Sequence, residues 1–235
     1  MICSFSYNFL FIKTTKTASS SIEIGLSKFC KGPDIFTPIW SDGSDKPEGE
    51  VERAARNNAL QWQDMGLRDF VSTLYNLRRP SRFGNHEGAA SVRKKLNPKT
   101  WEDLYKFTVV RNPYDRIVSM YFWQMRNKRN TKLPTVFQWL CENPLVPNET
   151  WRLCAEDGSF ILDDFIRYEN LEDDLRRVGK HLGLPSDLRD AVFEKRLKTS
   201  QRPPNASVDT VLDPSSRELI QLMCRREFEV FGYDP

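Results

Sequence analysis

Several features that define common protein classes are scarce or missing in this sequence. Its five cysteines are odd in number and form no C-x-x-C pair, which argues against a structural zinc site or a disulfide framework and fits a reducing compartment. No run approaches the ~18 consecutive apolar residues of a membrane-spanning helix. The start, MICSFSYNFLFIK, has neither a basic leader nor a small-residue cleavage site. These absences predict a cytoplasmic protein without a transmembrane segment.

The excess of charge is small as well. The chain has 35 basic and 32 acidic residues, a net charge of +3. This is too mild for a dedicated nucleic-acid-binding protein, although it allows a local basic pocket. With 39% hydrophobic residues among 235 and no internal repeat, we expect a single domain over residues 1–235. A stretch at about 31–85, rich in Pro, Gly, Asp and Ser in its first half, predicts a loop-rich insertion.

Three short apolar segments, each followed by a helical pattern, indicate the fold. They span residues 8–13, 105–111 and 165–169. After the first, Ile22, Leu26 and Phe29 recur at the spacing of one helix face. Asn112 and Pro113 follow the second and are typical of a helix start. Strands that each lead into a helix predict a three-layer α/β fold, with a central parallel sheet flanked by helices.

The polar stretch after the first strand, FIKTTKTASSSIE from residue 11, suits an anion. It leads into a helix, whose first N–H groups lack partners and whose dipole is positive there. Lys16 adds a full charge. The hydroxyl donors beside it are Thr17, Ser19, Ser20 and Ser21. A simple alternative is a capping box formed by Ser20 and Glu23. The stretch lacks the glycines of a Walker A loop.

A second candidate anion site lies in VVRNPYDRIVS. Arg111 ends the second strand. Ser119 follows Asn112 by close to two helical turns, so Ser119 faces the same side of the helix as Asn112. Arg116 precedes Ser119 by three residues and lies on the same face. Arginine and serine beside a helix N-terminus can hold a phosphate. The alternative is an arginine–aspartate ion pair that uses Asp115. Together, the two sites suggest a ligand with two phosphates.

These stretches resemble motifs of the sulfotransferase family. FIKTTKTASSSI resembles the family's 5′-phosphosulfate loop, commonly F-I-x-x-P-K-T-G-G-T-S, and FTVVRNPYDRIVSMY is similar to its 3′-phosphate motif, R-[ND]-P-x-x-R-x-x-S-x-Y. FIRYENLEDDL and the ending FEVFGYDP are similar to two further family segments. The resemblance covers residues 8–234 and implies a sulfotransferase fold like that of the P-loop NTPases.

The resemblance implies 3′-phosphoadenosine 5′-phosphosulfate (PAPS) as the sulfate donor, with no metal required. Its 5′-phosphosulfate would be held by Lys16, Thr17, Ala18, Ser19, Ser20 and Ser21. Arg111 and Ser119 would hold its 3′-phosphate, and a basic loop with Lys198 and Arg202 could close over the nucleotide. Ala18 and Ser19 replace the family's glycine pair, and Thr15 replaces a proline. The glycine-rich C-terminal motif of the small-molecule enzymes is missing, which favours the carbohydrate-type and bacterial branch.

The same resemblance suggests catalytic roles. Sulfuryl transfer builds negative charge on a phosphate oxygen, which Lys16 is expected to stabilise. An acceptor hydroxyl needs a base. In sulfotransferases similar to the heparan 2-O enzymes, a histidine in a context like that of His86, in FGNHEGAA, is that base, and Glu87 is the adjacent alternative. His181, near a helix C-terminus, suggests no function.

The acceptor and the general class of protein stay open at this point. Residues 31–60 and the aromatic segment 121–151 are candidate walls of an acceptor site, although aromatic residues also build cores. A carbohydrate hydroxyl is the first expectation, and a lipid or other small alcohol the second. A nucleotide kinase or NTPase with a degenerate phosphate loop and a non-catalytic, sulfotransferase-like binding protein are the alternatives.

Overall fold

A five-stranded, mostly parallel sheet forms the centre of the molecule. The computed structural model describes residues 1–39, 54–77, 79–126, 132–194 and 202–235. The strands are β1 (Ile2–Ser4), β2 (Phe9–Ile12), β3 (Ile35–Phe36), β4 (Tyr105–Val110) and β7 (Asp164–Arg167). Their order is β3-β1-β2-β4-β7. β2, β4 and β7 are parallel, whereas β1 is antiparallel to both of its neighbours. The three predicted strands and the α/β class are confirmed; β1 and β3 extend the sheet unexpectedly.

Both faces of β2 are buried, and this requires a helical layer on each side. Side chains alternate along a strand, so Phe9 and Phe11 enter one core cluster while Leu10 and Ile12 enter another. All four side chains are fully buried. A parallel sheet with apolar residues on both faces is stable only when helices cover both.

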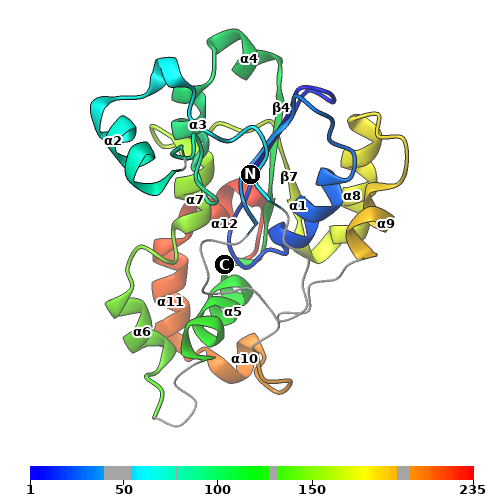
Figure 1. The fold of residues 1–235 in the computed structure, drawn as a ribbon. Coiled ribbons are helices and arrows are strands. Elements are labelled where there is room, and N and C mark those ends of the chain that lie inside the picture. Colours follow the sequence, from blue (N-terminus) through cyan, green and yellow to red (C-terminus); the bar gives the residue numbers. More distant parts are fainter. Residues whose placement is uncertain (40–53, 78, 127–131, 195–201) are drawn as a thin grey trace.

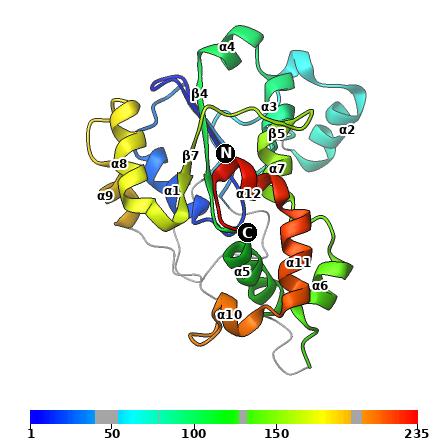
Figure 2. The same cartoon turned by 180° about the vertical axis from the view of Figure 1, so that it is seen from behind.

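The helices supply these two layers, as Figure 1 and, from behind, Figure 2 show. One face of the sheet packs against α1 (Ser19–Ser27), α8 (Leu171–His181) and α9 (Leu188–Phe193). The other packs against α3 (Ala89–Lys95), α4 (Pro98–Asp103) and α7 (Glu149–Cys154). The expected three-layer arrangement is therefore present.

A third cluster lies beyond the sheet, below it in Figure 1. It is formed by α5 (Pro113–Met125), α6 (Val136–Glu142), α10 (Val208–Val211), α11 (Pro214–Met223) and α12 (Arg225–Phe231). The remaining elements are the short helices η1 (Trp62–Asp64) and η3 (Tyr168–Asn170), helix α2 (Leu67–Asn76), and a hairpin of β5 (Ala155–Glu156) and β6 (Ser159–Phe160). In the described ranges no helix is both long and apolar enough to cross a membrane.

The helix starts were only partly predicted. Asn112 caps α5 by accepting a hydrogen bond from the Tyr114 N–H, as expected. The capping box of Ser20 and Glu23, considered above as the alternative to an anion site, is not formed. Ala18 occupies the N-cap of α1 without a side-chain hydrogen bond. Glu23 is instead buried and forms an ion pair with the Lys13 ammonium, 3.1 Å away, because a buried charge needs a partner of opposite sign.

Arg116 does not share the predicted anion site with Ser119. Its side chain is fully buried and forms an ion pair of 2.9 Å with Glu227 of α12. It also donates a hydrogen bond to the Pro147 carbonyl oxygen. Arg116 therefore fastens α5 to α12, and its role is structural.

Removing one partner of this buried pair should destabilise the protein strongly. Glu227→Ala leaves an uncompensated buried guanidinium, which costs about 3–5 kcal/mol. At roughly 2–4 °C per kcal/mol for a chain of this length, Tm should fall by about 6–20 °C. Glu229→Ala is the control, because Glu229 pairs with Arg225 at the surface, where such pairs contribute under about 1 kcal/mol. Equal melting temperatures for the two variants would contradict a structural role of the pair.

Candidate active site

The two predicted anion-binding loops lie side by side. They follow β2 and β4, which are parallel neighbours, so both loops leave the same edge of the sheet. The Thr14 hydroxyl donates to the Val109 carbonyl oxygen over 2.6 Å. Arg111 donates through Nη1 to the Lys16 carbonyl oxygen over 2.9 Å. The loop around Lys16 is thus attached directly to the arginine of the second motif.

The first loop adopts a glycine-like shape without glycine. Lys16 and Ala18 have φ values of 59° and 60°, in the left-handed region. For residues with a Cβ this conformation costs about 1–2 kcal/mol. Ala18 stands where the resembling motif has its first glycine, a residue that adopts the left-handed region without a steric penalty. α1 begins directly after it, and its first N–H groups have no intrahelical acceptor.

Three hydroxyl groups hold this loop from inside. Thr17 and Ser19 are buried, and their hydroxyl oxygens lie 2.6 Å apart. The Thr14 hydroxyl lies 2.9 Å from that of Thr17. Two of the residues predicted to offer hydroxyls to a phosphate are therefore hydrogen-bonded to each other in this structure. Ser20 and Ser21, both half-buried at the start of α1, are the remaining hydroxyls of the predicted set.

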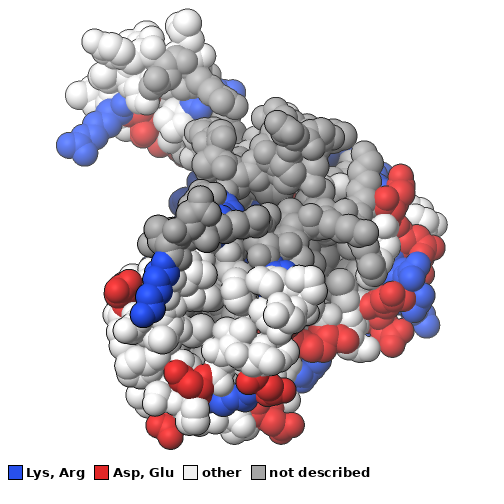
Figure 3. All heavy atoms as spheres, turned by 90° about the horizontal axis from the view of Figure 1, so that it is seen from below, with Lys and Arg blue, Asp and Glu red and all other residues white. Residues whose placement is uncertain are grey.

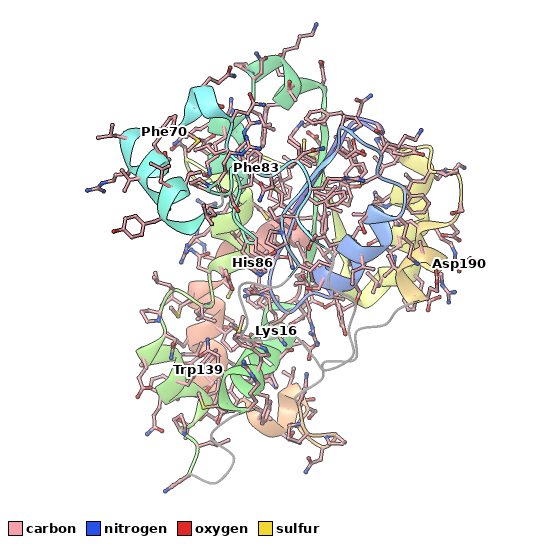
Figure 4. The ribbon with its side chains drawn as sticks, in the orientation of Figure 1. Lys16, Phe70, Phe83, His86, Trp139 and Asp190 are labelled. Carbon is pink, nitrogen blue, oxygen red and sulfur yellow. The ribbon has the colours of Figure 1, made fainter. Side chains whose placement is uncertain are left out.

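Lys16 and His86 approach this end of the sheet from different parts of the chain. Figure 4 shows Lys16 in the loop before α1 and His86 in the segment before α3. The Lys16 ammonium lies 5.7 Å from the centre of the Trp123 ring on α5. Lys16 is half-buried. Its contact with the Trp123 ring places its charge between the anion loop and α5.

Arg111 belongs to a cluster of two arginines around one carboxylate. Its Nε donates to Asp115 over 2.7 Å, and Arg202 forms an ion pair with the same carboxylate. The arginine–aspartate pair considered from the sequence is therefore present. Burial alone would raise the pKa of Asp115, but the charges and hydrogen bonds of Arg111 and Arg202 hold it below its usual value. The cluster retains a net positive charge.

Three further residues were predicted to bind the donor. Ser119 lies further along α5 and is half-buried. Lys198 lies outside the described residues. Arg202, from the predicted basic loop, forms an ion pair with Asp115, which also pairs with Arg111.

The two other segments that resemble sulfotransferase motifs meet at the same place. Glu169, after β7, accepts a hydrogen bond from the Asn112 N–H over 2.7 Å. The Tyr233 hydroxyl, near the end of the chain, donates to the same carboxylate over 2.9 Å. The guanidinium of Arg111 lies 4.1 Å from the centre of the Tyr168 ring. Four sequence segments are thus joined around Arg111.

The geometry favours His86 over Glu87 as a base. His86 Nδ1 lies 3.2 Å from the Lys13 carbonyl oxygen. Because a carbonyl only accepts, Nδ1 carries the proton and Nε2 keeps a lone pair. Burial and then the charge of Lys13 lower the pKa of His86, which favours the neutral ring.

The carboxylate of Glu87 is already engaged. It accepts a hydrogen bond from the Gly84 N–H over 2.6 Å. It also accepts from Ser91 and pairs with Lys95 of α3. Although burial opposes this, these contacts lower the pKa of Glu87. Glu87 therefore stabilises the turn into α3.

Sequence reasoning missed two residues near the site. The buried ammonium of Lys13 donates to the Ile39 carbonyl oxygen over 3.0 Å and to Asn85 over 3.1 Å, next to His86. Glu149, the first residue of α7, accepts a hydrogen bond of 2.5 Å from Thr15. Lys13 could have been suspected, since a lysine that ends a buried strand needs polar partners. Glu149 lies in a stretch with no recognisable motif.

Three of the six aromatic residues in the proposed acceptor-wall segment 121–151 are buried in cores. Tyr121 and Trp139 are buried in the cluster beyond the sheet, and Trp151 is buried beside α12. Their assignment as walls is wrong, because no surface remains for an acceptor. Trp123, half-buried beside Lys16, is the aromatic residue that reaches the site.

Comparison with known proteins agrees with this geometry. An uncharacterised protein of Archaeoglobus fulgidus is 30% identical to the chain over 101 residues, covering 41% of this chain and 82% of that protein. A model of the Sulfotransferase family matches residues 1–234, which include both loops, the Glu169 segment and Tyr233. The chain therefore belongs to the sulfotransferase family.

Proposed function

We propose that the protein transfers a sulfuryl group from PAPS to an acceptor hydroxyl, with a carbohydrate as the first candidate acceptor. The proposal depends above all on the hydrogen bond between Arg111 and the Lys16 carbonyl oxygen, 2.9 Å long. This contact puts two cationic side chains on adjacent loops at one edge of the sheet. A nucleotide with phosphates at two positions fits two adjacent cationic sites better than a nucleotide with one phosphate chain.

The residues of the site suit such a donor. The N-terminus of α1 and Lys16 would hold the 5′-phosphosulfate, and Arg111, Ser119 and Arg202 the 3′-phosphate. When bound, the donor supplies a sulfuryl group on a phosphate leaving group. Asp115 occupies the two arginines in the structure, so a bound phosphate would share or replace its contacts.

The chain's own side chains provide the chemistry of transfer. Lys16 places a positive charge where negative charge grows on the leaving oxygen. His86 takes the proton of the acceptor hydroxyl on Nε2, because its Nδ1 is held by the Lys13 carbonyl. Trp123, beside Lys16, offers an aromatic face that suits a sugar ring.

The donor is tested most directly by thermal stability. Adenosine 3′,5′-bisphosphate at a hundred times its dissociation constant should add about 2.7 kcal/mol, which raises Tm by roughly 5–10 °C. The shift should need no magnesium. ATP with magnesium should give a much smaller shift, because it has no 3′-phosphate for the Arg111 site. A larger shift with ATP and magnesium would identify a nucleotide kinase or NTPase, and no shift with either would refute the donor.

Lys16 and Arg111 should affect different steps. Lys16→Ala should lower turnover by ~100-fold or more, the scale of one preorganised donor, and change donor affinity less. Arg111→Ala should weaken binding of adenosine 3′,5′-bisphosphate by about 10- to 100-fold, as loss of a charge-assisted bond does. Turnover with saturating donor and calorimetric titration separate the two. Arg225→Ala, at an exposed pair on α12, is the control. An unchanged affinity in Arg111→Ala would place the second phosphate elsewhere.

The pH profile tests His86. Its pKa lies below the ordinary 6.5, and the base must be neutral. The specificity constant kcat/KM should therefore be independent of pH above neutrality. It should fall by about tenfold per pH unit once the pH drops below the lowered pKa of His86. His86→Ala should lose ~100-fold or more in rate and also lose this acidic limb. His181→Ala, the variant of the other histidine, should keep the limb. A limb that persists in His86→Ala would assign the base to another group.

A further inference from the structure

Helix α2 turns its apolar side outward. Leu67, Leu74 and Tyr75 are 87%, 75% and 88% exposed. These residues recur at helical spacing and form one face. Asp69 and Thr73, on the opposite face, are half-buried. An ordinary surface helix has the reverse arrangement, so this face is built to contact something apolar.

The sequence around α2 has an excess of positive charge. Residues 67–103, which include α2, α3 and α4, contain eight basic and four acidic residues, although the whole chain has a net charge of only +3. α2, α3 and α4 lie near one another in both views of the ribbon. Arg68, Lys94 and Lys99 are exposed and form no ion pair within the described ranges. On the face seen from below in Figure 3, by contrast, acidic and basic side chains are interspersed.

We propose that α2 and the basic surface beside it bind the face of an anionic lipid bilayer. The apolar face lies on a single helix at the periphery of the molecule (Figures 1 and 2), and a fluid bilayer accommodates such a helix without a matching groove. Its basic neighbours complement anionic headgroups, each strengthening partitioning by about fivefold. A second copy of the chain docking on the same face would instead oppose two basic surfaces. This inference does not depend on the donor or on the acceptor proposed above.

The position of α2 relates the bilayer to the catalytic site. The chain runs from α2 through Phe83 to His86, and Figure 4 labels Phe70 on α2 and then these two residues toward the centre of the molecule. Phe83 is buried, so this connection is anchored in the core. A protein docked through α2 would therefore hold the His86 side of its site at a fixed place relative to the lipid surface.

Sedimentation with vesicles tests the proposal. The protein should bind vesicles of phosphatidylcholine with about a third phosphatidylglycerol, and bind pure phosphatidylcholine at least tenfold more weakly. Leu67→Ser/Leu74→Ser should lose about tenfold or more in partitioning, since two aliphatic side chains no longer enter the interface. Leu145→Ser/Leu222→Ser is the matched control, because these leucines are 67% and 75% exposed elsewhere and should leave partitioning unchanged.

Salt and charge variants complete the test. About 0.5 M salt should weaken binding, because it screens the headgroup charge. Lys94→Glu/Lys99→Glu should weaken it at low salt, with melting temperature showing that the variant is folded. Equal partitioning of the two leucine variants, or equal binding to neutral vesicles, would overturn the proposal. So would a dimer in solution that Leu67→Ser/Leu74→Ser dissociates, because the face would then belong to a second copy.

Discussion

The parallel pairing of β2 with β4 is the constraint on which the candidate site depends. Parallel strands end at one edge, so the segments that follow them meet there although they are far apart in sequence. The buried bond from Thr14 to the Val109 carbonyl and the bond from Arg111 to the Lys16 carbonyl both follow from this register. A slip by one residue would exchange the faces of Phe11 and Ile12 and disrupt both cores. Core packing and the geometry of the candidate anion site therefore depend on the same strand register.

Much of this arrangement could be predicted, because its signals are local. The three parallel strands are short apolar runs bounded by polar residues, and Asn112 followed by Pro113 marks the start of α5. β1 and β3 have three and two residues, too few for a periodic pattern. The burial of Arg116 could not be seen from the sequence, because its partner Glu227 lies far along the chain. At Ser20 and Glu23 the local capping pattern is overridden by a tertiary ion pair with Lys13.

Charges in this protein serve two separate purposes. Arg116 and Glu227, like Lys13 and Glu23, are paired inside the molecule and fix how helices and strands meet. Around Arg111, two arginines share one aspartate, so a net positive charge remains at the candidate site. The sequence shows both groups as similar basic and acidic residues. Only their degree of burial distinguishes the structural ion pairs from the charges around Arg111. That burial depends on contacts between segments far apart in the sequence. For the same reason, sequence spacing alone does not show whether the predicted site residues other than Lys16 and Arg111 lie at the site or in the core.

The hydrogen bonds among the buried hydroxyls of Thr14, Thr17 and Ser19 bear on how the loop before α1 would bind an anion. Glycine-rich phosphate loops are free to rearrange, and ordering them on binding reduces conformational entropy. Here the loop is already ordered by its own hydroxyl groups and by the strand beneath it. An anion would therefore bind here with little further loss of backbone conformational entropy. The same rigidity narrows the range of anion shapes the loop can accept, so selectivity among nucleotides would be set before any ligand arrives.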